Sequence, residues 1–175
     1  MRCPNCSAEI SDSDVICLEC GCETVSGRPM RWHLFLVHLG LWIAGFVCIA
    51  LGVGNMVGVQ YLIQGMPPGA VYDVFPALTY IDFVYGLLLV GVGILFFLCR
   101  ARLRSFKKRA PLLLNLAYAA LIVLAAVYSV VSSTVVGTPA SRLVGVNEIA
   151  SVVGMAVGVS LNAAYYKKRD FLFEP

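Results

Sequence analysis

The chain of 175 residues contains few charged side chains: only 13% of its residues are Asp, Glu, Lys or Arg. An ordinary soluble domain carries roughly a quarter of its residues as charged side chains. Hydrophobic residues instead make up 59% of the chain, and the mean hydropathy is +0.84. This shortage of charge excludes a typical soluble domain and predicts an integral membrane protein.

The sequence also lacks the short motifs that accompany several enzyme chemistries. It contains no G-x-x-x-x-G-K-[ST] phosphate loop, no G-x-S-x-G nucleophile turn and no H-E-x-x-H zinc-binding helix. No apolar segment of the kind found in a secretory signal peptide precedes the first cysteine. We therefore expect no enzymatic activity, and an N-terminus in the cytosol, where thiols remain reduced.

Cysteine, by contrast, is concentrated at the start, where five of the seven cysteines fall within the first 22 residues. Cys3-Pro-Asn-Cys6 and Cys17-Leu-Glu-Cys20 are two C-x-x-C pairs, and ten residues separate them. Two thiolates three positions apart on a tight turn can bind one ion, and two such turns supply the four sulfur atoms that zinc prefers. The spacing predicts a metal site with a small β-hairpin through Ile10–Ile16.

The two pairs resemble the short zinc-ribbon that opens many bacterial proteins, with the pattern C-P-x-C-G followed by C-x-x-C-G. The resemblance covers about the first 21 residues, with Ser7 in place of the usual Gly and Ile16 in place of a frequent aromatic residue. It implies a single structural Zn²⁺ ion with the ligands Cys3, Cys6, Cys17 and Cys20. Because so short a module cannot bury a core of its own, metal binding would supply its folding free energy.

Two alternatives remain for the cysteines. Cys22 is either a spare thiol beside the site, an alternative ligand or a redox-sensitive thiol. The C-x-x-C pairs could also be redox-active, although no βαβ pattern surrounds them. A sensor of zinc or redox state that uses Cys22 would release its metal under mild oxidant.

Four apolar segments after the cysteines predict four transmembrane helices, since about 20 apolar residues cross the hydrocarbon core. The predicted spans are residues 32–56, 81–99, 111–136 and 149–166. This arrangement places twelve of the thirteen Lys and Arg residues on one side and only Arg142 on the other. The positive-inside rule then predicts a multi-pass protein of the cell membrane with both termini in the cytoplasm.

The densest charge cluster is Arg100–Arg109, in which six of ten residues are Lys or Arg. With Phe106 among these residues, the cluster fits a nucleic-acid patch. Its position between two predicted spans instead favours an orientation signal that contacts anionic lipid. We expect the lipid bilayer, and not nucleic acid, as its partner.

Small residues recur every four positions in two spans and predict close helix packing, within the chain or in a homo-oligomer. They are Gly40, Ala44 and Cys48 in the first span, and Ala150, Gly154, Gly158 and Asn162 in the fourth.

Three ionisable residues stand in or beside the spans and are candidates for function. His38 is either a packed neutral histidine or a proton-relay or metal residue. Asp82 and Glu148 lie at the outer ends of the second and fourth spans. They either face one another as a cation site or are simply solvated.

The sequence thus predicts an all-α polytopic membrane protein with a four-helix bundle and an N-terminal zinc-ribbon. Its parts are the ribbon (1–26), a linker (27–31), the transmembrane domain (32–169) and a cytosolic tail (170–175). The arrangement is similar to uncharacterised families of bacterial membrane proteins, which implies the bacterial inner membrane and no defined activity. The leading hypothesis is a cytosolic docking or assembly module that binds a protein partner. A small transporter or channel, or an accessory subunit of one, is the alternative, and a zinc or redox sensor is the second.

Overall fold

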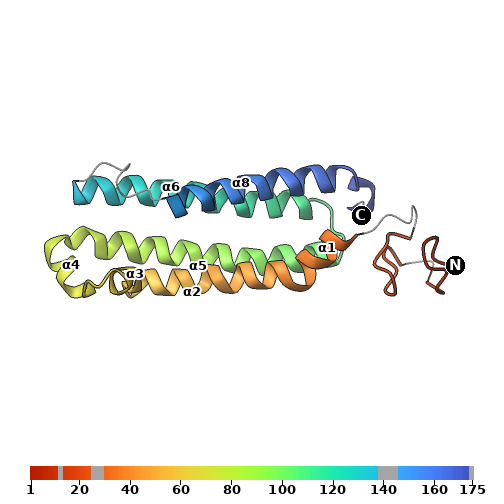
Figure 1. Ribbon diagram of the computed structural model, residues 1–175, viewed down its shortest axis with the longest axis horizontal. Helices are drawn as coiled ribbons and strands as arrows, with labels where there is room; N and C mark the ends of the chain where they lie inside the picture. The colour runs from red at the N-terminus through yellow and green to blue at the C-terminus, as the bar shows by residue number, and fades with distance from the viewer. Residues whose placement is uncertain (12–13, 25–29, 138–145, 174–175) are drawn as a thin grey trace.

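The computed structural model of the chain is mostly helical (Figure 1) and describes residues 1–11, 14–24, 30–137 and 146–173. The α-helices are α1 (Arg31–Phe35), α2 (Leu41–Met56), α3 (Val59–Ile63), α4 (Pro68–Val74), α5 (Pro76–Arg104), α6 (Ala110–Val136) and α8 (Val146–Lys167). A π-helical turn, Leu36–Gly40, joins α1 to α2, and a 3₁₀ turn, Asp170–Phe173, follows α8. Strand pairing within the described ranges is limited to two isolated bridges.

In the part of the chain that the structure describes, three helical segments are long and apolar enough to cross a membrane: Arg31–Met56, Pro76–Arg104 and Ala110–Val136. Large apolar side chains cover their outer faces. Phe46, Leu98 and Val123, for example, are each more than half exposed. Because such surfaces are unfavourable in water, they indicate contact with lipid and a membrane protein. The segment predicted as a fourth span lies within α8, which packs alongside α6 (Figure 1).

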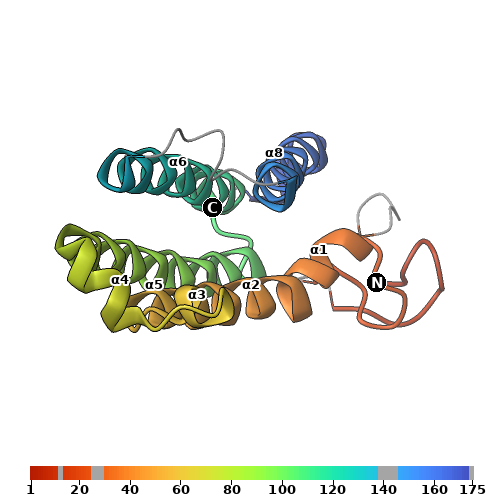
Figure 2. The ribbon, with the colours of Figure 1, turned by 60° about the vertical axis from the view of Figure 1, so that its left-hand side comes forward.

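The helices form two layers, with α2 and α5 in one and α6 and α8 in the other (Figures 1 and 2). The short turn Ser105–Arg109 connects the layers at one end of the bundle, and the cysteine-rich residues 1–24 lie beyond that end. We call it the module end. The helices α3 and α4 cover the opposite end of α2 and α5, which we call the far end (Figure 1).

The layer of α2 and α5 is held together by direct contact between the two backbones. A Cβ atom added to Gly52 would lie 2.6 Å from the carbonyl oxygen of Gly86. Only helices without side chains at the crossing can approach so closely. Of the small residues predicted to pack in the first span, Cys48 is buried in this interface.

The small-residue stripe predicted on the fourth span behaves differently. A Cβ atom added to Gly154 or Gly158 would meet no other atom within 4 Å. Among the stripe residues whose side chains the structure describes, Gly154, Gly158 and Asn162, only Asn162 is buried, and its Oδ1 accepts a hydrogen bond of 2.9 Å from Nε1 of Trp32. The Gly154–Gly158 motif is therefore not used for packing between the described helices of this chain.

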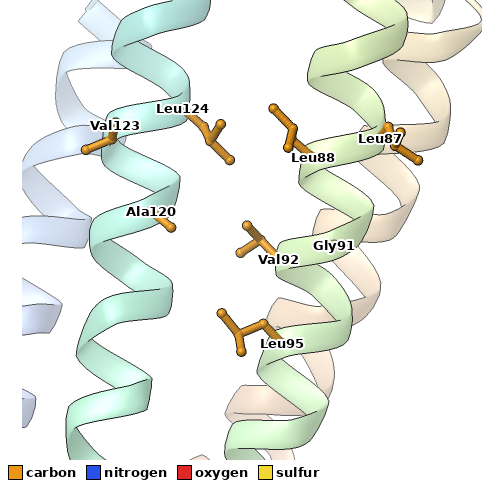
Figure 3. Close-up of a pocket in the computed structure, with 8 residues that line it drawn as sticks. All are labelled: Leu87, Leu88, Gly91, Val92, Leu95, Ala120, Val123 and Leu124. Carbon is orange, nitrogen blue, oxygen red and sulfur yellow. The ribbon is translucent and has the colours of Figure 1, made fainter.

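Packing between the two layers is concentrated at the module end. The buried side chains there include Leu41, Phe96, Leu103, Leu114 and Tyr166. Farther along, α5 and α6 separate and leave an apolar groove of about 460 Å³. In this groove Leu88, Val92 and Leu95 of α5 point toward α6 (Figure 3). The layers therefore meet firmly at one end and only loosely in the middle.

The helix α5 is longer at both ends than the predicted span 81–99. It begins with Pro76 in its first turn, a position where proline loses no hydrogen bond. At its other end it continues through Arg104, so the predicted basic turn Arg100–Arg109 is half helix. Continuing the helix keeps its backbone hydrogen bonds satisfied while the long basic side chains reach past the end of the span.

One of these basic residues, Arg100, contacts the π-helical turn in the first span. Nε of Arg100 donates a 2.8 Å hydrogen bond to the carbonyl oxygen of Val37 within this turn. The guanidinium also lies 4.6 Å from the ring centroid of Trp42. Arg100, expected to be part of a charge cluster, therefore joins α5 to the first span. His38, in the same turn, has an exposed side chain.

Candidate metal centre and buried carboxylate

The N-terminal cysteine module, residues 1–24, begins with a tight turn around the first C-x-x-C pair. The amide of Cys3 donates to the carbonyl oxygen of Ala8, and the amide of Ser7 donates to that of Cys3, both at 2.9 Å. An antiparallel bridge between Arg2 and Glu9 closes the turn. These bonds hold both thiols of the pair on the same side of the backbone.

The second pair repeats the first turn 14 positions later. The amide of Cys17 donates to the carbonyl oxygen of Cys22 at 2.9 Å, and the amide of Gly21 donates to that of Cys17 at 2.8 Å. A bridge between Ile16 and Glu23 closes it. The β-hairpin predicted through Ile10–Ile16 is not confirmed, because backbone pairing runs within each turn instead.

The residue after each pair has a left-handed backbone, with φ of 62° at Ser7 and 66° at Gly21. Glycine adopts this conformation freely, whereas a residue with a Cβ atom pays about 1–2 kcal/mol. The replacement of the usual glycine by Ser7 therefore leaves the turn intact and adds backbone strain.

The two turns bring the four predicted ligands Cys3, Cys6, Cys17 and Cys20 together. Their Sγ atoms all lie within 4.8 Å of one another. Sγ of Cys3 is 3.6 Å from that of Cys20, and Sγ of Cys6 is 3.7 Å from that of Cys17. A tetrahedral ion with metal–sulfur bonds of about 2.3 Å separates its sulfur atoms by about 3.8 Å. The four cysteines therefore fit a metal ion.

The electrostatics of the cluster also favour a cation. The backbone amide of Cys22 lowers the pKa of Cys20 to about 6. The amide of Ala8 acts in the same direction on Cys6, but loss of hydration and the neighbouring sulfur atoms raise the pKa of Cys6 to about 12. Four sulfur atoms this close cannot all carry a negative charge unless a cation balances them. Metal binding would remove this conflict by converting all four thiols to thiolates.

Cys22 lies beside the cluster without belonging to it. Its side chain is only 4% exposed, and Sγ donates to the carbonyl oxygen of Cys20 at 3.8 Å. Burial raises the pKa of the thiol, which lowers the fraction of reactive thiolate. Its surroundings thus favour the spare-thiol interpretation over a redox-sensitive one.

The module contacts the start of the helical bundle through its second turn. The amide of Met30 donates a 2.9 Å hydrogen bond to the carbonyl oxygen of Gly21, and the side chain of Met30 is fully buried. A Cβ atom added to Gly21 would lie 2.6 Å from Cδ1 of Leu34 in α1. The metal-site turn therefore packs directly against the first helix.

Behind this contact, four segments of the chain meet around one imidazole ring. His33 of α1 is 2% exposed and stacks on Phe106 of the connecting turn, with 4.9 Å between the ring centroids. Nδ1 of His33 is 3.2 Å from the hydroxyl oxygen of Tyr166, and the edge of Phe173 packs against the same ring. The sequence singled out His38 instead, because its depth in the span could be read and the burial of His33 could not.

The far end holds a second polar site, centred on Asp82 of α5. Its side chain is completely buried. Oδ2 accepts hydrogen bonds from the hydroxyl groups of Tyr61 at 2.8 Å and Tyr72 at 3.1 Å, and from Nε2 of Gln60 at 3.1 Å. Oδ1 accepts a 2.8 Å hydrogen bond from the hydroxyl group of Tyr128. Donors from α3, α4 and α6 therefore converge on one carboxyl group.

The expectation that Asp82 is solvated is wrong. The helices α3 and α4 fold over it, so that Tyr61 and Tyr72 turn their hydroxyl groups toward the carboxyl group. Tyr128 was not among the predicted site residues, although a tyrosine inside an apolar span was a signal for a polar partner. The side chain of Glu148 lies outside the described residues, so its pairing with Asp82 stays a prediction.

Comparisons of the chain with family models, with curated proteins and with solved structures give no match. The interpretation of the four-cysteine cluster and of the Asp82 site therefore depends on the geometry of this structure alone.

Proposed function

We propose that the chain is an integral membrane protein that displays a cytosolic zinc-binding module as a docking site for a protein partner. The observation that carries this proposal is the position of the module, beyond one end of the helical bundle and packed on α1 (Figure 1). A module in this position is anchored to the membrane domain while its outer turns remain accessible.

One side chain of the module is suited to contact a partner. Leu18, between the second pair of cysteines, is 94% exposed. Its turn is fixed by the hydrogen bonds around Cys17, and a bound ion would fix it further. An apolar side chain on a rigid turn loses little conformational entropy when a partner covers it.

Zinc is the ion proposed because four thiolates in a tetrahedral arrangement are a typical structural zinc site. A cytosolic location agrees with free thiols and with the charge at the module end. The basic residues in α5, the connecting turn and the end of α8 are Arg100, Arg102, Arg104, Lys107, Lys108, Arg109 and Lys167. In this proposal α8 is the fourth span, and its open face at Gly154 and Gly158 suits a helix of a second copy.

Co-purification from crosslinked membranes tests the docking proposal. Cys17→Ser removes a ligand, and Leu18→Ser removes the exposed apolar side chain while leaving all four ligands. We expect partners to be lost with the first variant and reduced with the second. Two control variants should retain the partners. Cys22→Ser changes a thiol beside the ligands, and Glu19→Ser changes an exposed neighbour of Leu18. An unchanged set of partners in both test variants would contradict a docking role.

A small transporter or channel, or its accessory subunit, is the second candidate, and the buried Asp82 site supports it. Polar residues at such positions often mark ion or proton pathways. A flux assay in liposomes, with the oligomeric state controlled, tests this function. A selective flux that Asp82→Asn abolishes would favour it, and absence of flux in the wild type would count against it.

A further inference from the structure

A groove lies between α1 and the end of α8, which both reach the module end of the bundle (Figure 1). Its volume is about 450 Å³, within the range of roughly 300–1,000 Å³ that is typical of small-molecule sites. Among the described residues that line it, none belongs to the metal module or to the Asp82 site. They are Trp32 of α1, Leu161, Ala164 and Tyr165 of α8, and Lys168 and Arg169 directly after α8.

The lining of the groove changes from apolar to basic along α8. Leu161, Ala164, Tyr165 and Lys168 are spaced at i, i+3, i+4 and i+7, so they share one face of α8 and of the turn that follows it. From Leu161 to Lys168 this face rises by about 10 Å. Apolar side chains therefore line the part of the groove nearer the middle of the bundle, and positive charges line the part nearer its end.

The groove lies at the level where a bilayer changes from hydrocarbon to headgroups. Trp32 is near the start of the membrane-capable segment Arg31–Met56. Its Nε1 donates a 2.9 Å hydrogen bond to Oδ1 of Asn162, which joins this end of the first span to α8. Tryptophan and tyrosine are enriched at membrane–water interfaces. Trp32 and Tyr165 therefore mark the headgroup level, and the two basic residues lie beyond it.

The two basic side chains at the rim of the groove differ in how they are held. The guanidinium of Arg169 lies 4.0 Å from the ring centroid of Tyr165, and its Nη1 donates a 3.3 Å hydrogen bond to the carbonyl oxygen of Tyr165. Lys168 is exposed. Among the described residues that line the groove, none is acidic. The rim therefore presents one positive charge held against an aromatic ring and one on an exposed, flexible side chain.

We propose that this groove is a binding site for one anionic phospholipid. Its acyl chains lie against Leu161 and Ala164, and its phosphate lies between Lys168 and Arg169. An apolar floor joined to a cationic rim is complementary to a lipid with a negative headgroup, whereas an acidic peptide matches the rim alone. The site goes beyond the docking function proposed for the metal module and does not depend on it.

A bound lipid differs from lipid that is attracted by the overall charge of the module end. Lys167 precedes Lys168 and is also exposed, but it is not among the residues that line the groove. Ala163 has the same relation to Ala164. General attraction would depend on Lys167 and Lys168 alike. A lipid seated in the groove distinguishes the members of each pair, so each pair contains its own control.

Native mass spectrometry of the full chain in detergent tests the proposal, with phosphatidylglycerol or phosphatidylcholine of the same acyl chains as the added lipid. One phosphatidylglycerol molecule should bind the wild type more tightly than phosphatidylcholine. Lys168→Gln should weaken phosphatidylglycerol binding about fivefold, the usual contribution of one basic residue at an anionic lipid surface. Lys168→Arg, which keeps the charge, and Lys167→Gln should both bind as the wild type.

A second pair of variants tests the apolar part of the groove. Ala164→Trp fills the groove and should abolish binding of the single phosphatidylglycerol molecule. Ala163→Trp adds the same side chain outside the groove and should retain it. Both alanine residues are exposed, so neither substitution crowds a buried position.

Several results would overturn the proposal. They are equal affinity of the wild type for the two lipids, equal effects of Lys167→Gln and Lys168→Gln, and unchanged binding in Ala164→Trp. A dimer in lipid-free detergent that Ala164→Trp dissociates would assign the groove to a second copy of the chain. Poly-glutamate that binds the wild type in place of phosphatidylglycerol, and loses affinity in Lys168→Gln, would assign it to an acidic peptide.

Discussion

At the module end four sulfur atoms converge on a point that a cation can occupy, whereas at the far end four donors converge on one carboxyl group. Both sites gather negative charge in a small space. The sulfur cluster contains no group of its own that balances this charge, so its stability depends on an ion from solution. The Asp82 site instead receives four hydrogen bonds from side chains of the chain itself.

The two sites also differ in the distance along the chain over which they are assembled. The metal cluster uses 18 consecutive residues, from Cys3 to Cys20. The donors to Asp82 come from residues as far away as Tyr128, 46 positions along the chain. A local site can fold when its ion binds, whereas the far-end site needs the helical layers to be in place first.

Removal of the metal should unfold the module end and leave the far end intact. Cys17→Ser, or treatment with a chelator, should reduce the metal content from about one ion per chain to near zero, because structural zinc contributes about 10 kcal/mol or more to such modules. Mass spectrometry of the purified protein measures the metal. Acid should act in the same way, since protons compete for the thiolates. Cys22→Ser is the matched control and should retain the ion.

Tyr128→Phe should weaken the far end without affecting metal content. The substitution removes the donor to Oδ1 of Asp82, which should cost about 1–3 kcal/mol because it leaves a buried acceptor atom without this hydrogen bond. Thermal unfolding in detergent measures the loss. Tyr80→Phe, a change of an exposed tyrosine near the same end, is the control. Equal destabilisation by both variants would show that the Asp82 hydrogen bond contributes nothing specific.

Gly52→Ala should lower the stability of the module end and of the far end together, because it separates the backbones of α2 and α5. The new Cβ atom would lie 2.6 Å from the carbonyl oxygen of Gly86, and overpacking of this kind costs about 1–3 kcal/mol. Gly91→Ala, in the same helical layer, places its Cβ atom where no atom lies within 4 Å. It should be neutral in thermal unfolding. Similar losses in both variants would contradict the close helix contact.

The smallest effect is expected for Ser7→Gly, which should strengthen the metal site. Glycine removes the strain of a left-handed backbone at position 7, a gain of about 1 kcal/mol. Competition with a chelator should show correspondingly tighter metal binding. Gly21→Ala, the equivalent position in the second turn, should weaken binding because its Cβ atom would also meet Leu34. No change in either variant would contradict the repeated turn geometry.

The sequence predicted best the features that depend on residues close together in the chain. Two C-x-x-C pairs identified the four cysteines that the structure brings together, and long apolar runs identified three membrane-capable helices. The sequence was least informative about which face of each helix packs against other helices. The membrane helices are apolar on all sides, so their periodicity does not separate lipid-facing from buried positions. For that reason the packing role of Gly52 and the open face at Gly154 could not be predicted.

Ionisable residues show the same contrast between features that the local sequence reveals and features that distant contacts decide. The position of Asp82 near the end of a span could be read, but its burial depends on α3 and α4, whose fold-back is not visible in the apolar pattern. Arg100 was expected in a charge cluster that contacts lipid, yet it bonds to a π-helical turn, and His33, which the sequence did not single out, lies in an aromatic cluster. Each was misjudged because its partners are distant in sequence.

By itself, then, the sequence determined the composition of the metal cluster and the membrane-helix character of three segments, because covalent spacing and run length decide both. The tertiary structure decided which polar groups meet in the bundle. Hydrogen bonds at Asp82 form between donors from three helices, and only the folded backbone brings their atoms within 2.8–3.1 Å. Such contacts depend on helix rotation and on the fold of the connections, which a nearly uniform apolar sequence does not encode locally.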